Sequence, residues 1–272
     1  MQARALELKR AGKSIGFVPT MGYLHEGHLS LMRIARAQCD VLVASIFVNP
    51  TQVGPNQDLD AYPRDFERDE QLCAGEGVDI VFYPSPETMY AENASVWVDE
   101  ESLSEVLCGS SRPGHFRGVC TVVAKLFNIV QPDRAVFGEK DAQQLRIIER
   151  MTRDLNFPVD IIRGPIVREA DGLAMSSRNK YLDAEQRAHA LCLRRALDGV
   201  AEHFGAGERN MARLRAGMVE LIERTPGAEI DYIEFVDDEG LVPVHEAAAP
   251  VLVALAVKFG ATRLIDNTVL SP

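Results

Sequence analysis

Cysteine is scarce in this sequence, and the cysteines present are not spaced for a disulfide framework or a zinc site. Their number is odd, they are scattered along the chain, and no two form a C-x-x-C pair. They are Cys39, Cys73, Cys108, Cys120 and Cys192. This pattern favours reduced thiols in a cytoplasmic protein.

Long apolar runs and long basic runs are also missing. No apolar stretch reaches the ~18 residues that a membrane span needs, and the N-terminus has no apolar core of signal-peptide length. The net charge is −11, and no Lys/Arg run could follow a phosphate backbone. We therefore expect a soluble cytoplasmic protein that contacts neither membranes nor nucleic acid. An anionic ligand would need locally placed basic residues.

What the chain does contain is an alternation of short apolar runs and helical patterns. Its 272 residues suffice for one large or two modest domains. The run VLVASIFV, residues 41–48, is typical of a central parallel strand covered on both faces. Together with apolar runs near residues 15–18, 80–83, 134–137 and 159–162, it predicts a Rossmann-like, doubly wound α/β sheet. The polar, turn-rich segment 51–65 is expected to be a loop.

The pattern changes after about residue 165. Helices are expected at roughly 183–204 and 209–224, followed by apolar runs at 232–236, 251–258 and 262–265 that indicate a small antiparallel sheet. The sequence thus predicts a Rossmann-like domain over residues 1–165 and a smaller α+β lid domain over residues 166–272.

The stretch VPTMGYLHEGH, residues 18–28, is the most informative part of the chain. It joins a predicted strand to a helix through a glycine turn, which places backbone N–H groups where they can hold an anion. His25 and His28 are three residues apart and face the same way on a helix start. Helix capping and zinc binding are alternatives, although metalloprotease histidines are four apart and no third ligand is nearby. The context favours phosphate binding.

Three further segments have polar or charged residues suited to a ligand, but each alone is weak. The segment GEKD at 138–141 follows a strand and opens a helix, and MSSRN at 175–179 carries two hydroxyls and a guanidinium. Either could equally be an ordinary helix N-terminus. Asn49 and Gln52 follow the central strand, and their amides suit hydroxyls or a carboxylate, or only hydrogen bonds within a loop.

In combination, these segments are much more specific. H-x-G-H after the first strand and an M-S-S-R turn after the sheet resemble the nucleotidyl-transferring superfamily that includes class I aminoacyl-tRNA synthetases. Within it, VPTMGYLHEGH, FVNPTQ, DAYPRD, RPGHFRGV, FGEKDAQQ and READGLAMSSRN resemble the pantothenate synthetase family in order and spacing. The resemblance covers about residues 14–182.

This resemblance implies a reaction and its participants. Members of the family condense pantoate with β-alanine, using ATP and Mg²⁺, through a pantoyl-adenylate, and release AMP and pyrophosphate. The resemblance also implies a homodimer. One rival is an adenylyltransferase that acts on a phosphorylated precursor, but uncharged Asn49 and Gln52 suit a hydroxy acid better than a phosphate. Another is a catalytically silent nucleotide-binding module.

The resemblance also assigns residues to roles. The expected catalytic residues are His28, in the proton-donor role, His25, Lys140 and Arg178. The expected ATP-binding residues are Met21, Gly22, Tyr23, Leu24, His25, Glu26, Gly27, His28, Gly138, Glu139, Lys140, Asp141, Val167 (at the adenine), Met175, Ser176, Ser177 and Arg178. The expected pantoate and β-alanine residues are Gln52, Gln144, Asn49 and Tyr62. Asp69 is the expected magnesium-side carboxylate.

Overall fold

The structure is a computed structural model that describes residues 1–52 and 62–272. Its contacts divide the chain into two units. The first comprises Met1–Glu105, Gly109–Glu139 and Ile147–Pro165, and the second comprises Val106–Cys108, Lys140–Arg146 and Ile166–Pro272. The second unit therefore takes two short pieces from the earlier chain, which a single boundary near residue 165 does not capture. Most of the predicted loop over 51–65, residues 53–61, lies outside the described residues.

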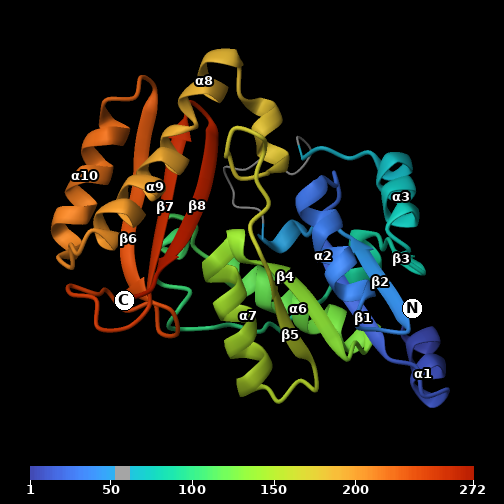
Figure 1. Cartoon of the computed structure of the whole chain (residues 1–272). Helices are drawn as coiled ribbons and strands as arrows, with labels where there is room; N and C mark the ends of the chain where they lie inside the picture. The colour runs from blue at the N-terminus through green and yellow to red at the C-terminus, as the bar shows by residue number, and fades with distance from the viewer. Residues whose placement is uncertain (53–61) are drawn as a thin grey trace. The chain divides into compact units, whose positions relative to one another are not determined.

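The first unit is organised around a five-stranded parallel sheet (Figure 1). Its strands are β1 (Ile15–Thr20), β2 (Val41–Ile46), β3 (Ile80–Phe82), β4 (Arg134–Gly138) and β5 (Asp160–Gly164). They lie in the order β3-β2-β1-β4-β5, and every pair is parallel. The predicted doubly wound sheet is confirmed. Its strand order reverses between β1 and β4, and ligands of such sheets bind beyond the carboxyl ends of the strands at that point.

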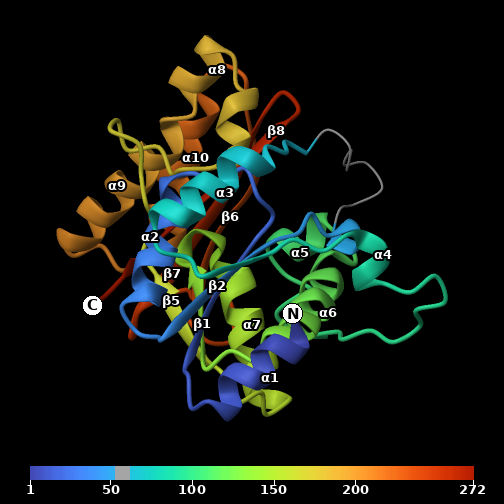
Figure 2. The ribbon, with the colours of Figure 1, turned by 90° about the vertical axis from the view of Figure 1, so that its right-hand side faces the viewer.

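Helices cover both faces of this sheet. The helices of this part of the chain are α1 (Gln2–Arg10), α2 (Glu26–Arg36), α3 (Phe66–Gly75), α4 (Pro86–Met89), α5 (Cys108–Ser111), α6 (His115–Val130) and α7 (Ala142–Asp154), with 3₁₀ turns at η1 (Pro50–Gln52) and η2 (Glu139–Asp141), and of these α1, α2 and α6 pack on its strands. Figure 2 shows α2 and α6 on opposite sides of β1. Because Leu31, Met32 and Ala35 share one face of α2 and are buried, that helix is held against the sheet by apolar packing.

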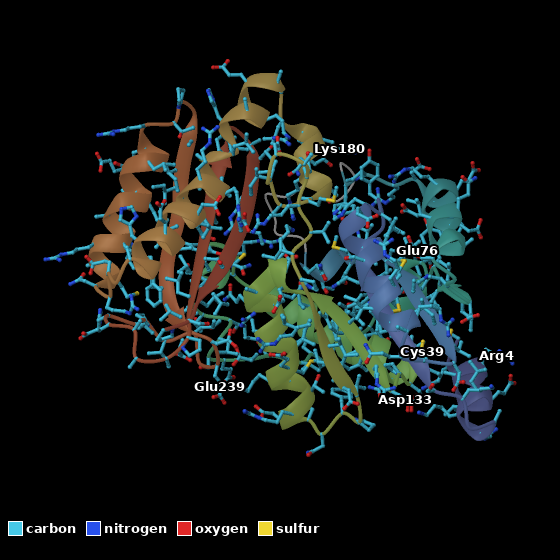
Figure 3. All side chains as sticks on the ribbon, in the orientation of Figure 1. Arg4, Cys39, Glu76, Asp133, Lys180 and Glu239 are labelled. Carbon is cyan, nitrogen blue, oxygen red and sulfur yellow. The ribbon has the colours of Figure 1, made fainter. Side chains whose placement is uncertain are left out.

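At the amino end of the sheet, Asp133, which directly precedes β4, links the start of β1 to the start of β4. One carboxylate oxygen accepts a hydrogen bond from the backbone N–H of Ile15 at 2.7 Å, and the other contacts Lys9. Figure 3 labels Asp133 at this edge. The acid aligns the starts of β1 and β4, and hence the turns at their opposite, carboxyl ends.

The second unit contains a three-stranded antiparallel sheet, which confirms that prediction. The order is β6 (Ala228–Asp237), β7 (Val251–Phe259) and β8 (Thr262–Leu270), and the other elements are α8 (Ala184–His189), α9 (Cys192–Gly205), α10 (Met211–Glu223) and η3 (Ser177–Tyr181). The helix predicted over 183–204 is interrupted at Ala190 and Leu191, where no glycine or proline marks the break. Among the described residues of either unit, no helix has the length and apolar character to cross a membrane.

Candidate active site

The turn after β1 is tightly constrained by its own backbone. Thr20 Oγ1 donates to Ser45 O at 2.8 Å and accepts from the N–H of Gly22 at 3.1 Å. Gly22 and Tyr23 then adopt left-handed backbone angles, with φ of 81° and 52°. A Cβ on Gly22 would also lie only 3.0 Å from Asp69 Oδ2. Glycine at this position is therefore required by conformation and by space.

Asp69, on α3, holds the same turn from the side. Its carboxylate accepts the N–H of Tyr23 at 2.6 Å and the N–H of Leu24 at 2.7 Å, and its residue is 1% exposed. The neighbouring Arg68 donates to Leu24 O at 3.0 Å and lies over the Tyr23 ring. Both oxygens of this acid thus serve to shape the turn.

The two histidines of the turn cap the helix that follows. Nδ1 of His25 accepts from the N–H of Gly27 at 3.1 Å, and Nδ1 of His28 accepts from the N–H of His25 at 3.3 Å. Their ring centroids are 4.1 Å apart. A backbone N–H can only donate, so neither Nδ1 carries the proton, and each neutral ring has its proton on Nε2. Capping therefore makes each ring an Nε2–H donor.

Zinc binding, the other alternative, gains no support. Within the residues described here, no group of three or more His, Cys, Asp or Glu side chains could hold a metal ion. Glu26, which begins α2, is exposed and pairs with Arg33 on the same helix.

Asn49 and Gln52 lie beyond the carboxyl end of β2 and are joined to the histidine turn. Asn49 Nδ2 donates to Gln52 Oε1 at 3.0 Å, and Gln52 Nε2 lies 3.1 Å from Met21 Sδ. Asn49 is 1% exposed, so its amide is engaged in internal bonds. Tyr62 is half-buried, at the start of the described chain after residue 61.

The segment after β4 crosses from the first unit to the second. Gly138 pairs with Gly164 of β5, and Glu139 belongs to the same unit. In the second unit, Lys140 Nζ lies 3.5 Å from Asp141 Oδ2, and the Lys140 carbonyl accepts from Asn267 Nδ2 at 3.0 Å. Gln144 is half-buried, whereas its neighbour Gln143 bonds to the backbone of Val106 and Cys108.

Within the second unit, Val167 and the 175–178 segment lie on the two arms of one hairpin. The N–H of Met175 donates to Val167 O at 3.0 Å. Ser176 Oγ accepts from the N–H of Arg178 at 3.3 Å and caps η3. The side chain of Arg178 is exposed. The capping interpretation is thus correct for Ser176, and it leaves the guanidinium of Arg178 at the surface.

Two sets of supporting residues were not predicted. In the first unit, Tyr90 donates to Asn49 Oδ1 at 2.9 Å, and Gly118 O accepts from Asn49 Nδ2 at 3.1 Å. In the second, Arg168 binds both oxygens of Asp266, at 2.7 and 3.0 Å. These pairs are separated by 41, 69 and 98 positions, and no local spacing rule could have indicated them.

Comparison with known proteins gives a consistent result over the whole chain. Residues 1–269 match the family model for pantoate-beta-alanine ligase. A pantothenate synthetase from Moorella thermoacetica is 61% identical over 262 residues, which are 96% of this chain and 93% of the relative. One from Pelotomaculum thermopropionicum is 58% identical over 270 residues, 99% and 96% of the two chains.

Solved structures agree. The crystal structure of pantothenate synthetase from Thermus thermophilus has a TM-score of 0.94, 47% identity, and 98% coverage of both chains. Pantoate-beta-alanine ligase from Francisella tularensis, complexed with Beta-gamma ATP and β-alanine, has a TM-score of 0.74, 33% identity, and coverage of 98% of this chain and 94% of its own. This chain belongs to the pantoate–β-alanine ligase family.

Proposed function

We propose that this chain condenses pantoate with β-alanine, with cleavage of ATP, through a pantoyl-adenylate intermediate. The condensation itself is the activity of the family to which the chain belongs. The observation that carries the two-step route is the pair of Nε2–H donors on His25 and His28, set on a strand–turn–helix that suits phosphate. When a carboxylate attacks the α-phosphate of ATP, hydrogen-bond donors are needed at the oxygens of that phosphate.

In the first step, the pantoate carboxylate attacks the α-phosphate of ATP, and pyrophosphate leaves. Two anions must approach one another, so donors and cations have to offset their repulsion. We assign the phosphate oxygens to His25 and His28, with His28 as proton donor and the 21–28 turn lining the site. The family resemblance assigns Lys140 and Arg178 to the phosphates as sources of positive charge.

The remaining nucleotide contacts are proposed from the family resemblance and the local geometry. Val167 would contact the adenine, and Met175, Ser176, Ser177 and Arg178 would close over the triphosphate. The segment 138–141 would border the ribose and phosphates. The exposed guanidinium of Arg178 supports this, since it lies at the surface where a ligand could reach it.

In the second step, the amine of β-alanine attacks the mixed anhydride, and AMP leaves. The anhydride is reactive enough that no protein nucleophile is required; only the neutral amine must be positioned. Gln52 and Gln144 are proposed to hold pantoate, and Asn49 and Tyr62 to shape the pocket. Because Asn49 is buried, we propose that its side chain positions neighbouring residues and does not contact the substrate directly.

Magnesium fits this site only as an ion held chiefly by the substrate. The described residues offer no group of three side chains for a metal, and Asp69, the expected ligand, already accepts two backbone N–H bonds. Mg²⁺ is commonly bound by one or two carboxylates plus the phosphates of a nucleotide. When bound, the ion would neutralise phosphate charge, and Asp69 would contribute one carboxylate at most.

We also propose a cytoplasmic homodimer. All five cysteines are free thiols, which suits a reducing compartment. Exposed apolar side chains at Val96 and Trp97 support association. Light scattering of the purified protein checks the dimer directly.

Pyrophosphate release tests the proposed route. With ATP and pantoate alone, we expect one equivalent of pyrophosphate per site, and adding β-alanine should give continuous turnover with AMP. Pyrophosphate that appears only when both acids are present would overturn the two-step route. A dinucleotide product would indicate the rival adenylyltransferase, and ATP binding with no pyrophosphate under any condition would indicate a silent module.

A further inference from the structure

We propose that Tyr90 is a positioning residue that acts through Asn49 to fix which end of the Gln52 side-chain amide faces the bound acid. This inference rests on the proposed role of Gln52 in holding pantoate. Tyr90 lies outside every motif of the sequence, 38 positions after Gln52 in the chain. The inference also gives a reason for the burial of Asn49.

The orientation of the Asn49 amide is decided by backbone groups. Oδ1 accepts from the N–H of Thr51 at 3.4 Å, and Nδ2 donates to the carbonyl of Gly118 at 3.1 Å. A backbone N–H can only donate and a carbonyl can only accept, so exchanging the two ends of the amide would break both bonds. Two hydroxyls then strengthen this arrangement, because Tyr90 Oη donates to Oδ1 at 2.9 Å and Thr51 Oγ1 donates to it at 3.0 Å.

Tyr90 is itself well placed for this role. Its ring packs near Phe47, with centroids 6.4 Å apart, and Lys125 Nζ lies 5.3 Å from the ring centroid on its face. Burial raises the pKa of the Tyr90 hydroxyl above its ordinary value. The hydroxyl therefore keeps its proton through neutral and mildly alkaline pH and remains a donor to Asn49.

The loop that carries Asn49 packs directly against α6. A Cβ on Gly118 would lie 2.3 Å from the Thr51 carbonyl oxygen, so only glycine permits this approach. The close contact is what brings Asn49 Nδ2 within reach of the Gly118 carbonyl. Asn49 is thus held by α6 on one side and by Tyr90 on the other.

The consequence falls on Gln52. Because Asn49 Nδ2 is a donor, the atom facing it at 3.0 Å must be Gln52 Oε1, and Gln52 Nε2 must face away. Nε2 lies 3.1 Å from Met21 Sδ, which is a weak acceptor. A carboxylate or hydroxyl oxygen of the acid would replace the sulfur with a stronger bond. The pocket therefore demands an acceptor atom at this position.

The primary test is Tyr90→Phe, which removes one hydroxyl and keeps the ring. The loss of one hydrogen bond that orients Gln52 should raise the KM for pantoate about fivefold, as expected for a bond of about 1 kcal/mol. The KM for ATP should not change, and the melting temperature should fall by only a few degrees, so the variant stays folded. Tyr83→Phe is the matched control, since Tyr83 is 53% exposed and stacks only on Phe66 among the described rings.

A double-mutant cycle distinguishes positioning from a general structural role. If Tyr90 acts through Gln52, Tyr90→Phe should have no further effect on pantoate KM in a Gln52→Ala background. Equal effects in both backgrounds, a changed ATP KM, or an unchanged pantoate KM in stable Tyr90→Phe would each overturn the inference. Absence of pantoate-dependent pyrophosphate release in the unmodified enzyme would instead refute the proposed function.

Asn49→Asp provides a second, independent test. A carboxylate at position 49 can only accept, so it loses the bond to the Gly118 carbonyl, and Gln52 should reverse its amide and turn Oε1 toward the acid. We expect pantoate binding, measured by calorimetry in the presence of an unreactive ATP analogue, to weaken by more than about tenfold while analogue binding persists. Unchanged pantoate binding in this variant would show that the amide orientation does not matter.

Discussion

The side chain of His28 accepts a hydrogen bond from the backbone N–H of His25, and this bond determines which tautomer the neutral His28 ring adopts. His25 in turn accepts from the N–H of Gly27, so each Nδ1 is an acceptor. The protons of the neutral rings therefore lie on Nε2. The helix cap and the phosphate-binding interpretation are two aspects of one arrangement.

Two substitutions of His28 separate the cap, made by Nδ1, from the Nε2–H donor. Asn places its Oδ1 near the position of Nδ1, so His28→Asn should keep the cap but lose the Nε2–H donor. We expect unchanged melting temperature and a fall in pantoyl-adenylate formation of about 10²–10³-fold, as for loss of one preorganised donor at a transition state. Single-turnover pyrophosphate release measures the step.

His28→Gln is the companion variant. Its longer side chain carries an N–H donor, so it should retain more activity than His28→Asn. Glutamine is also a standard capping-box residue at this third helical position, so it should keep the cap. If His28→Asn adenylates pantoate at the normal rate, the Nε2–H donor is not required and the assignment of His28 is wrong.

Asp69 is predicted to act on the same turn by holding its backbone. Asp69→Asn is isosteric, but an amide has only one accepting end, so one of the N–H groups of Tyr23 and Leu24 loses its partner. A buried donor without a partner costs about 1–3 kcal/mol of unfolding free energy. Urea denaturation should show this loss, together with weaker ATP binding.

Asp65→Asn controls for the change of charge on α3. Asp65 caps this helix by accepting from the N–H of Arg68 at 3.3 Å, and asparagine caps equally well. It should therefore leave stability and ATP binding unchanged. A magnesium titration separates the two roles of Asp69: if excess Mg²⁺ restores full activity to Asp69→Asn, metal binding outweighs positioning.

Much of the sheet and the placement of the motifs could be predicted, because both depend on local pattern. The run 41–48 reads as a buried strand, and the residues after it, Asn49 and Gln52, lie beyond the carboxyl end of β2 as expected. Strand limits were less accurate. β6 begins at Ala228, four positions before the apolar run, because backbone pairing with β7 extends a strand beyond its apolar residues.

The parts that could not be predicted depend on contacts between distant residues. Nothing near Asn49 in the sequence indicates that Tyr90 will bind its Oδ1, or that Gly118 of α6 will accept from its Nδ2. Likewise, the assignment of residues 106–108 and 140–146 to the second unit follows from packing alone. These contacts decide how a motif is oriented, whereas the sequence pattern decides only where it occurs.

The ion pair of Arg168 and Asp266 is predicted to hold the hairpin that carries Met175. Asp266 is 2% exposed, and both of its oxygens are bound by the guanidinium. Asp266→Ala leaves a largely buried cation without its partner and should cost about 3–5 kcal/mol. Urea denaturation measures the loss, and the KM for ATP should rise if the hairpin holds the nucleotide.

The exposed pair of Arg224 and Glu220 gives a matched control for this prediction. Both side chains are more than half exposed, and such pairs contribute about 0–1 kcal/mol. Glu220→Gln should therefore be close to neutral. Equal effects of Asp266→Ala and Glu220→Gln would contradict the role given to burial.

The buried cysteines predict a loss of stability at alkaline pH. Burial raises the pKa of Cys73 and of Cys192 to about 11 and that of Cys120 to about 12. An unfolded thiol ionises near pH 9, so the unfolded state alone loses these protons first. The contribution of the protonated thiols is fully present below pH 9 and is lost as pH rises toward 11 and 12.

Cys120→Ala isolates one of these contributions. Each pKa unit corresponds to about 1.4 kcal/mol, and about two units separate pH 11 from the unfolded pKa, so the fall in unfolding free energy between pH 8 and pH 11 should shrink by roughly 3 kcal/mol in this variant. The comparison uses the slope with pH, because the substitution also changes packing at every pH. Cys39→Ala, at the half-exposed cysteine in Figure 3, should alter the slope less. Identical slopes in Cys120→Ala and the unmodified protein would show that ionisation of this thiol does not limit alkaline stability.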